Sequence, residues 1–172
     1  MVYFDSAYVA KFYLSEPESD RVRALAEREG KVCCSAIGRV ETAQVFHRKL
    51  REGKATRAEC AALFDQFETD CESGLWTWLP LTEDMVTSAV RRFRELSPKV
   101  PLRSADAIHL VSAHEHGIDA IYTNDARVLA AASAFGIHGQ TASLELQRLE
   151  GSRAAPRDAI RTAVARPRAS RR

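Results

Sequence analysis

Residues 2–13 read VYFDSAYVAKFY. The first three are apolar and are followed by Asp5 and Ser6, after which apolar side chains recur at helical spacing at positions 8, 9, 12 and 13. This change of period predicts a short buried strand that ends at Asp5 and a helix that begins directly after it. A strand joined to a helix by an acidic turn is typical of the first unit of an α/β domain.

The remaining sequence continues this alternation. Apolar runs predict further strands at residues 31–34, 75–79 and 120–123, and residues 137–138 are expected to add an edge strand. Helices are predicted at about residues 18–29, 35–51, 82–96, 104–117 and 125–136, with Ser35 as an N-cap, and another helix reaches residue 72 after a turn at 53–55 to form a helical hairpin. This order predicts a three-layer α/β/α sandwich around a parallel sheet of four or five strands.

The composition is that of one globular domain. The chain has 172 residues, of which 45% are hydrophobic and 28% charged, and we assign the domain to residues 1–150. No apolar run approaches the roughly 20 residues of a membrane span and the N-terminus lacks signal-peptide features, so we expect a cytoplasmic protein that binds no membrane. The cysteines lack metal-binding spacing and are expected to be reduced thiols in or near the core: Cys33, Cys34, Cys60 and Cys71.

Residues 151–172 differ from the domain that precedes them. They hold seven arginines and one acidic residue, although the formal net charge of the whole chain is +2. Rich in Ala, Pro and Arg, this tail is expected to be disordered and solvated. Its charge would also suit RNA phosphates, and the sequence leaves that alternative open.

Two acidic residues directly follow predicted strands. Asp5 ends the first strand, and Asp125 follows the strand at 120–123. Because ligands of open parallel sheets bind beyond the carboxyl ends of the strands, both carboxylates are expected at the same edge. Taken singly, each is more typical of a helix N-cap. Their shared edge is what favours a functional site.

Glu41 lies between Ile37 and Val45 on one helical stripe, which places a carboxylate among apolar neighbours. Burial of a charge without a partner is costly, so this position indicates either a functional acid or an ion pair with a buried arginine such as Arg39 or Arg103.

Asp106 stands at helical spacing before Leu110 and is expected to face inward, although complementation of the helix dipole would also explain it.

Several carboxylates brought together repel one another unless a cation joins them. Ligands that offer only oxygen suit Mg²⁺, with Mn²⁺ as a substitute, and a magnesium site uses one or two carboxylates directly and keeps open positions for water and phosphate.

Four segments together resemble the PIN-domain nucleases: residues 2–7 (VYFDSA), Glu41 early in its helix, residues 104–110 (SADAIHL) and residues 123–125 (TND). More narrowly, the chain resembles the VapC toxins of VapBC toxin–antitoxin systems over about residues 1–140. The resemblance implies a metal-dependent endoribonuclease that cuts structured RNA such as tRNA or rRNA, usually forms a homodimer and is silenced by a cognate antitoxin protein.

The resemblance also implies which residues form the site. The metal-site acids would be Asp5, Glu41, Asp106 and Asp125. Ser6 and Thr123 are second candidates for hydrogen bonding a metal ligand or water, although helix capping and strand filling explain them equally well. Basic residues that would hold RNA are Arg48, Lys49, Arg51 and Lys54, a run that is also typical of a solvated face.

Three other functions stay open at this point. A metal-free histidine ribonuclease would need a residue such as His109, whose apolar neighbours indicate a packed side chain instead. A magnesium-binding aspartyl-phosphate regulatory domain would have paired acids at the first strand and a late lysine, and no lysine follows Lys99. A catalytically silent PIN-like protein that binds partners is the third, and the presence of all four acids argues against it.

Overall fold

The computed structural model describes residues 1–145, so the tail predicted at 151–172 and the domain boundary at 150 lie outside the described residues. The centre is a five-stranded sheet in the order β3-β2-β1-β4-β5, and every neighbouring pair is parallel. The strands are β1 (Val2–Phe4), β2 (Val32–Ser35), β3 (Trp76–Leu79), β4 (Ala120–Tyr122) and β5 (His138–Gln140). The predicted parallel sandwich and its edge strand are confirmed.

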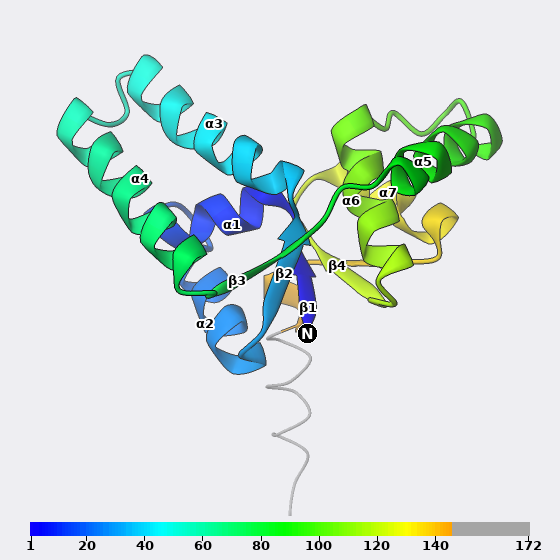
Figure 1. The fold of residues 1–172 in the computed structure, drawn as a ribbon, viewed down its shortest axis with the longest axis horizontal. Coiled ribbons are helices and arrows are strands. Elements are labelled where there is room, and N and C mark those ends of the chain that lie inside the picture. Colours follow the sequence, from blue (N-terminus) through cyan, green and yellow to red (C-terminus); the bar gives the residue numbers. More distant parts are fainter. Residues whose placement is uncertain (146–172) are drawn as a thin grey trace, which may run out of the picture.

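Helices cover both faces of the sheet (Figure 1). On one side lie α1 (Ser6–Tyr13), α2 (Ser19–Glu29), α3 (Ile37–Arg51) and α4 (Arg57–Glu72); on the other lie α5 (Glu83–Glu95), α6 (Ser104–Glu115), α7 (Ala126–Ala131) and the 3₁₀ turn η1 (Ala132–Phe135). The predicted helical hairpin is α3 with α4, and it forms one arm of the molecule, while α5 and α6 form the other. None of the helices described is both long and apolar enough to cross a membrane.

Successive side chains of the inner strands enter two separate cores. Tyr3 packs with residues of α5, α6 and α7, whereas its neighbour Phe4 packs with residues of α1 and α2. Cys33 and Cys34 divide in the same way, as do Ile121 and Tyr122. Burial of each large apolar side chain contributes about 1.5–3 kcal/mol. The described cysteines are free thiols in or near the core, as predicted.

Two predicted boundaries are wrong. Ser35 does not cap α3, because it remains in β2, pairs with Leu79 of β3 and donates its N–H to the Tyr3 hydroxyl at 2.9 Å. The N-cap of α3 is Ala36, which makes no side-chain cap. The helix predicted up to residue 136 is split into α7 and η1, and the chain leaves η1 through Gly136 at a φ of 73°.

The first turn of α3 is packed tightly on β2. Gly38 is buried, and a Cβ atom added to it would lie 2.3 Å from the Sγ of Cys34, which is itself fully buried in the sheet. Only a residue without a side chain lets α3 approach the sheet this closely. Glu41 lies three residues later on the same helix, so this contact also sets the height of its carboxylate above the sheet.

We therefore expect Gly38→Ala to destabilise the protein. Overpacking a core costs about 1–3 kcal/mol, and the better helix propensity of alanine returns up to about 1 kcal/mol, which leaves a net loss of about 1–2 kcal/mol. Urea denaturation measures the change. Val40→Ala in the same turn, at a side chain that is 70% exposed, is the matched control. Adding Cys34→Ala should recover part of the loss, and a Gly38→Ala protein as stable as wild type would contradict the packing described.

The order of the strands determines where a ligand can bind. From β1 the chain adds β2 and β3 on one side and then returns to add β4 and β5 on the other. A parallel sheet has its crevice where the strand order reverses, beyond the carboxyl ends of the strands. Here that point lies between β1 and β4, which end next to Asp5 and Asp125.

Candidate active site

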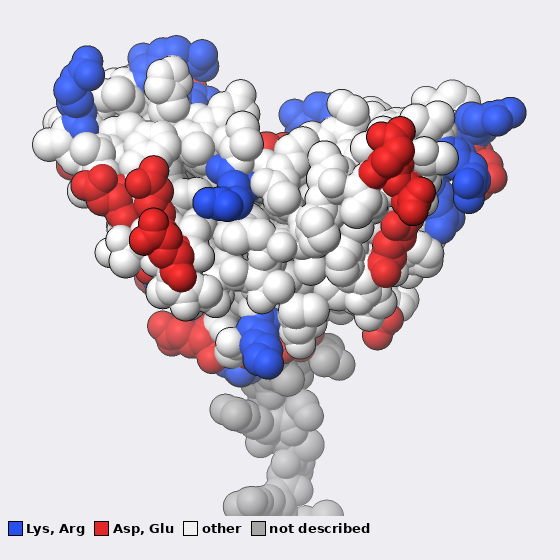
Figure 2. All heavy atoms as spheres, viewed as in Figure 1, with Lys and Arg blue, Asp and Glu red and all other residues white. Residues whose placement is uncertain are grey.

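A cavity of about 350 Å³ opens at this point of the sheet. Figure 2 shows a hollow between the two arms of the molecule. The four acids predicted from the sequence all line this cavity, although they come from the ends of two strands and from two helices. The polar residues of its wall are Asp5, Ser6, Glu41, Gln44, Arg48, Arg103, Ser104, Asp106, His109 and Asp125.

Asp5 is the most buried of the four acids, with 6% of its surface exposed. It caps α1 by accepting the N–H of Tyr8 at 2.8 Å, and its second oxygen accepts the Thr123 hydroxyl. Burial raises the pKa of Asp5 to about 6, against the lowering effect of these two hydrogen bonds. Among residues 1–145, no basic side chain forms an ion pair with Asp5. It is a buried carboxylate whose charge has no cationic partner in this part of the chain.

Thr123 connects the two strand-end acids. Its Oγ1 donates to Asp5 and accepts the backbone N–H of Asp125 at 2.9 Å. Thr123 is fully buried and does not line the cavity, so its contact with the site is made through these two acids.

Glu41 is held by a buried chain of hydrogen bonds. Its Oε2 lies 2.7 Å from Nε2 of His109, whose Nδ1 lies 2.8 Å from the Tyr3 hydroxyl. That hydroxyl also accepts the N–H of Ser35 at 2.9 Å, and the Glu41 carboxylate accepts the hydrogen bond from Nε2 of His109. A continuous chain of contacts thus extends from the core of the sheet to the carboxylate in the cavity.

Burial raises the pKa of Glu41, but hydrogen bonds from His109 and Ser6 and the positive charge of Arg103 outweigh it, and the net shift is downward. The ion pair with a buried arginine considered above is not formed: Glu41 contacts His109, while Arg39 lies over the ring of Trp78 at 5.8 Å. His109 is buried, as its neighbours predicted, yet it also lines the site, a role the sequence reading missed. The signal was its position three residues after Asp106, on the same face of the helix.

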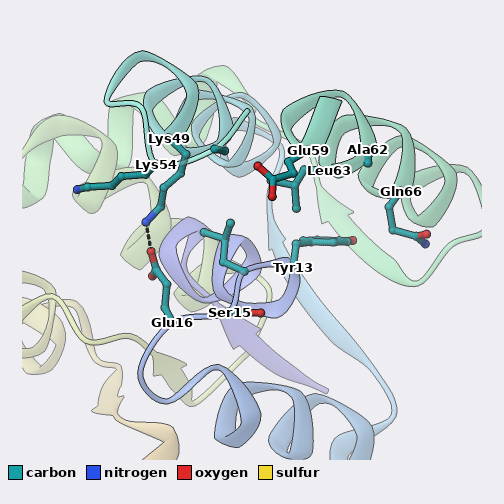
Figure 3. Close-up of a pocket in the computed structure, with 11 residues that line it drawn as sticks. Tyr13, Ser15, Glu16, Lys49, Lys54, Glu59, Ala62, Leu63 and Gln66 are labelled. Carbon is teal, nitrogen blue, oxygen red and sulfur yellow. Dashed lines mark hydrogen bonds and ion pairs between the residues drawn. The ribbon is translucent and has the colours of Figure 1, made fainter. Parts of the chain in front are cut away.

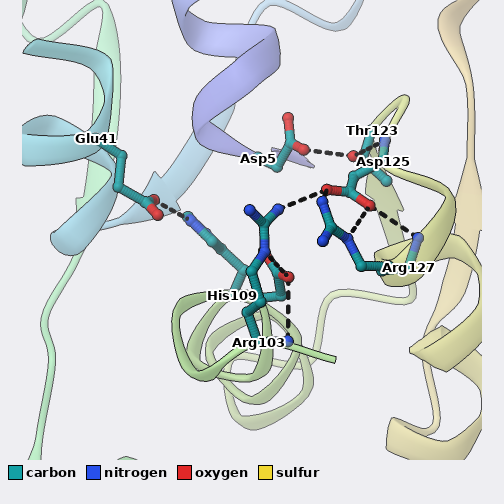
Figure 4. A network of polar contacts seen from close by, with 8 residues as sticks. Asp5, Glu41, Arg103, His109, Thr123, Asp125 and Arg127 are labelled. Atoms are coloured by element: carbon teal, nitrogen blue, oxygen red, sulfur yellow. Dashed lines mark hydrogen bonds and ion pairs between the residues drawn. The ribbon is translucent and has the colours of Figure 1, made fainter. Parts of the chain in front are cut away.

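Arg103 joins the remaining two acids (Figure 4). Its Nη2 lies 2.8 Å from Asp125, and its Nε lies 3.1 Å from Asp106. Asp125 also caps α7 by accepting the N–H of Arg127 at 2.8 Å and pairs with the Arg127 guanidinium at 3.3 Å. Burial raises the pKa of Asp125, but the contacts with Arg127 and the charge of Arg103 outweigh it and give a net lowering.

The donor set fits a hydrated divalent cation. Within residues 1–145 no three His, Cys, Asp or Glu side chains form a cluster close enough to hold an ion, so a preformed cage is not present in this range. Magnesium needs no such cage, because it keeps several waters and takes one or two carboxylates directly. Asp5 offers a buried carboxylate that forms no ion pair with another residue of the described range 1–145, and three further acids line the same cavity.

The basic residues predicted to hold RNA do not share one surface. Arg48 lines the acidic cavity. Lys49 and Lys54 line a second cavity of about 480 Å³ between the end of α1 and the α3–α4 hairpin, where Lys49 pairs with Glu16 (Figure 3). Arg51 is exposed in the last turn of α3, and Lys and Arg side chains gather at that outer end of the hairpin (Figure 2).

The chain matches known proteins in sequence and in fold. A family model described as PIN domain matches residues 2–134. Ribonuclease VapC47 of Mycobacterium tuberculosis (strain CDC 1551 / Oshkosh) is 33% identical over 135 residues, which cover 75% of this chain and 88% of that protein.

Solved structures share the fold. VapC20 of Mycobacterium tuberculosis, described as a toxin that cleaves the sarcin-ricin loop, matches with a TM-score of 0.61 at 16% identity and covers 76% of this chain and 95% of its own. FitAcB of Neisseria gonorrhoeae matches with a TM-score of 0.64 at 17% identity, over 83% of this chain and 99% of its own. The match of the family model and the identity to VapC47 establish that this chain belongs to the PIN-domain family, among its VapC-type members.

Proposed function

We propose that this protein is a divalent-metal-dependent endoribonuclease, the toxin of a toxin–antitoxin pair, that hydrolyses phosphodiester bonds of structured RNA such as tRNA or rRNA. The observation that carries the proposal is the meeting of four carboxylates from separate segments in one cavity, with Asp5 buried there and without a cationic partner among the described residues. The similarity to a ribonuclease of the VapC group supports the choice of RNA.

Asp5, Glu41, Asp106 and Asp125 are the residues that would hold Mg²⁺, or Mn²⁺ in its place. The ion would supply Lewis acidity, which lowers the pKa of water and stabilises negative charge on the phosphate oxygens. The carboxylates must be ionised to serve as ligands, and the lowered pKa values of Glu41 and Asp125 keep both ionised at neutral pH.

The surrounding residues orient these acids. His109 and Thr123 are positioning residues, because each fixes one carboxylate through a hydrogen bond and His109 does so at the end of a buried chain. Ser6, which lines the cavity and contacts Glu41, has the same role. Arg48 stands at the wall of the cavity and is the member of the predicted RNA-binding group best placed to contact a phosphate there.

The partners and the location are proposed from the resemblance to the family. A nuclease active on cellular RNA must be restrained, so we propose a cognate antitoxin protein as partner. A homodimer and a cytoplasmic location are also proposed, on the resemblance to VapC toxins.

Cleavage of total cellular RNA by the purified protein tests the proposal. We expect cutting with Mg²⁺ or Mn²⁺, none in excess chelator, and 5′-phosphate ends on the downstream fragments, because water rather than the RNA 2′-hydroxyl is the nucleophile. Ligation of an adaptor that requires a 5′-phosphate reads the ends. Cutting in excess chelator, or fragments that end in 2′,3′-cyclic phosphate, would overturn the proposed chemistry.

A further inference from the structure

We propose that Arg103 has two positions in the working cycle: it rests on Asp106 and Asp125 in the metal-free protein and moves to a phosphate of the RNA when a divalent cation takes these carboxylates. This inference rests on the proposed function and assigns a substrate-binding role to a residue outside the four acids.

The resting position is defined by three contacts. Nη2 of Arg103 donates to Asp125 at 2.8 Å, Nε donates to Asp106 at 3.1 Å, and the backbone N–H donates to the same Asp106 oxygen at 3.3 Å. Arg103 therefore places one positive charge between two acids, of which Asp106 lies in α6 and Asp125 is the N-cap of α7. In Figure 4 its guanidinium lies below Asp5, and a dashed line joins one of its nitrogens to Asp125.

A cation and this guanidinium compete for the same oxygens. Both Asp106 and Asp125 use Oδ2 for Arg103, and an oxygen that accepts these hydrogen bonds is less available to a metal ion. A divalent ion brings twice the charge to the same carboxylates. Because the Arg103 side chain is 59% exposed, its ion pairs are screened by water and are easily exchanged.

The released guanidinium would still line the cavity. Arg103 is the residue directly before α6, and its side chain forms part of the cavity wall beside the acids. A planar guanidinium can bind a phosphate through two parallel N–H donors, and in this cavity Arg103 would do so beside Arg48, which also lines the wall. Binding RNA in this way compensates the ion pairs that Arg103 gives up.

Arg127 offers a matched control within the same site. It also pairs with Asp125, at 3.3 Å through Nε, and it is partly exposed at 42%. It follows Asp125 by two residues and does not line the acidic cavity. Replacing Arg127 therefore removes one positive charge beside Asp125, but it removes no group that lines the cavity and could reach a phosphate there.

The test measures two affinities of the full-length, metal-free protein. Titration calorimetry gives Mn²⁺ binding, and a filter assay gives binding of bulk tRNA in Ca²⁺, with gels to verify that the RNA stays intact. We expect Arg103→Ala to tighten Mn²⁺ binding at least about threefold and to weaken tRNA binding at least about fivefold. Arg103→Lys should restore part of the tRNA binding, and Arg127→Ala should change both affinities less than Arg103→Ala does.

Opposite signs of the two changes distinguish this role from a structural one. If Arg103 only held Asp106 in place, Arg103→Ala would weaken Mn²⁺ binding, and that result would overturn the inference. Unchanged tRNA binding, or equal effects of Arg127→Ala, would overturn it as well and would leave the proposed nuclease function standing. A wild-type protein that binds no Mn²⁺ overturns both. Thermal melts by circular dichroism verify that each variant is folded.

Discussion

Replacing Asp106 with asparagine is expected to reduce RNA cleavage at least about 100-fold without unfolding the protein. The substitution removes one negative charge from the cavity that the proposed cation occupies. Asparagine has nearly the same size, and its oxygen can still accept the N–H of Arg103, which Asp106 accepts at 3.3 Å. The beginning of α6 is therefore retained while a metal ligand is weakened.

Initial rates on total RNA at saturating Mg²⁺ measure this effect, with thermal melts in parallel. Glu115→Gln is the matched control, because it makes the same kind of change at an exposed position at the other end of α6. Cleavage by Asp106→Asn at the wild-type rate would remove Asp106 from the mechanism, whatever the other acids contribute.

Replacing Asp5 with asparagine is expected to abolish cleavage and to stabilise the metal-free protein. The pKa of Asp5 is raised to about 6 by burial, from the usual 3.8. In the unfolded chain Asp5 has its usual pKa of 3.8. The protonated carboxyl therefore stabilises the folded state fully below that pH, and this stabilisation is lost as the pH rises through 6. At neutral pH the folded protein therefore holds an ionised carboxylate at a cost of about 3 kcal/mol, and a neutral amide avoids this cost.

Urea denaturation of wild type and Asp5→Asn in excess chelator gives the measurement. The gain in free energy of unfolding should be small near pH 4 and grow through about pH 6 to a plateau above it. Asp125→Asn provides a control of opposite sign. The pKa of Asp125 is lowered, so its charge stabilises the folded state above the unfolded pKa, and its removal should destabilise the protein at neutral pH. A less stable Asp5→Asn protein at pH 8 would contradict the burial of an unpaired charge.

If Asp5→Asn is both inactive and more stable than wild type, the residue that the reaction needs also lowers the stability of the metal-free protein. A buried carboxylate without a cationic partner weakens the fold and is retained where a cation is to be bound. Added Mn²⁺ should then stabilise wild type more than Asp5→Asn, because the ion binds the folded state.

The strands, the helices and the meeting of Asp5 with Asp125 could be predicted from the sequence. The change from short apolar runs to helical period identifies the elements, and parallel topology brings the ends of β1 and β4 to one edge. Glu41 could be predicted for another reason, its place on an apolar stripe. These features depend on neighbours along the chain and on general rules of topology.

The contacts that connect the acids could not be predicted in this way. His109 reaches Glu41 across 68 residues of sequence, and Arg103 reaches Asp125 across 22. Both pairs depend on how α6 sits against α3 and α7, which no local pattern encodes. The failed N-cap at Ser35 has the same origin, because pairing with β3 and the bond to Tyr3 hold this residue in the sheet.

The most direct test of the four-carboxylate site is an anomalous difference map from crystals of the protein grown with Mn²⁺. The account predicts a peak in the cavity, bonded to Asp5 and to at least one of Glu41, Asp106 and Asp125. A well-ordered cavity without a peak at millimolar Mn²⁺, or a peak bound by none of these four acids, would contradict it.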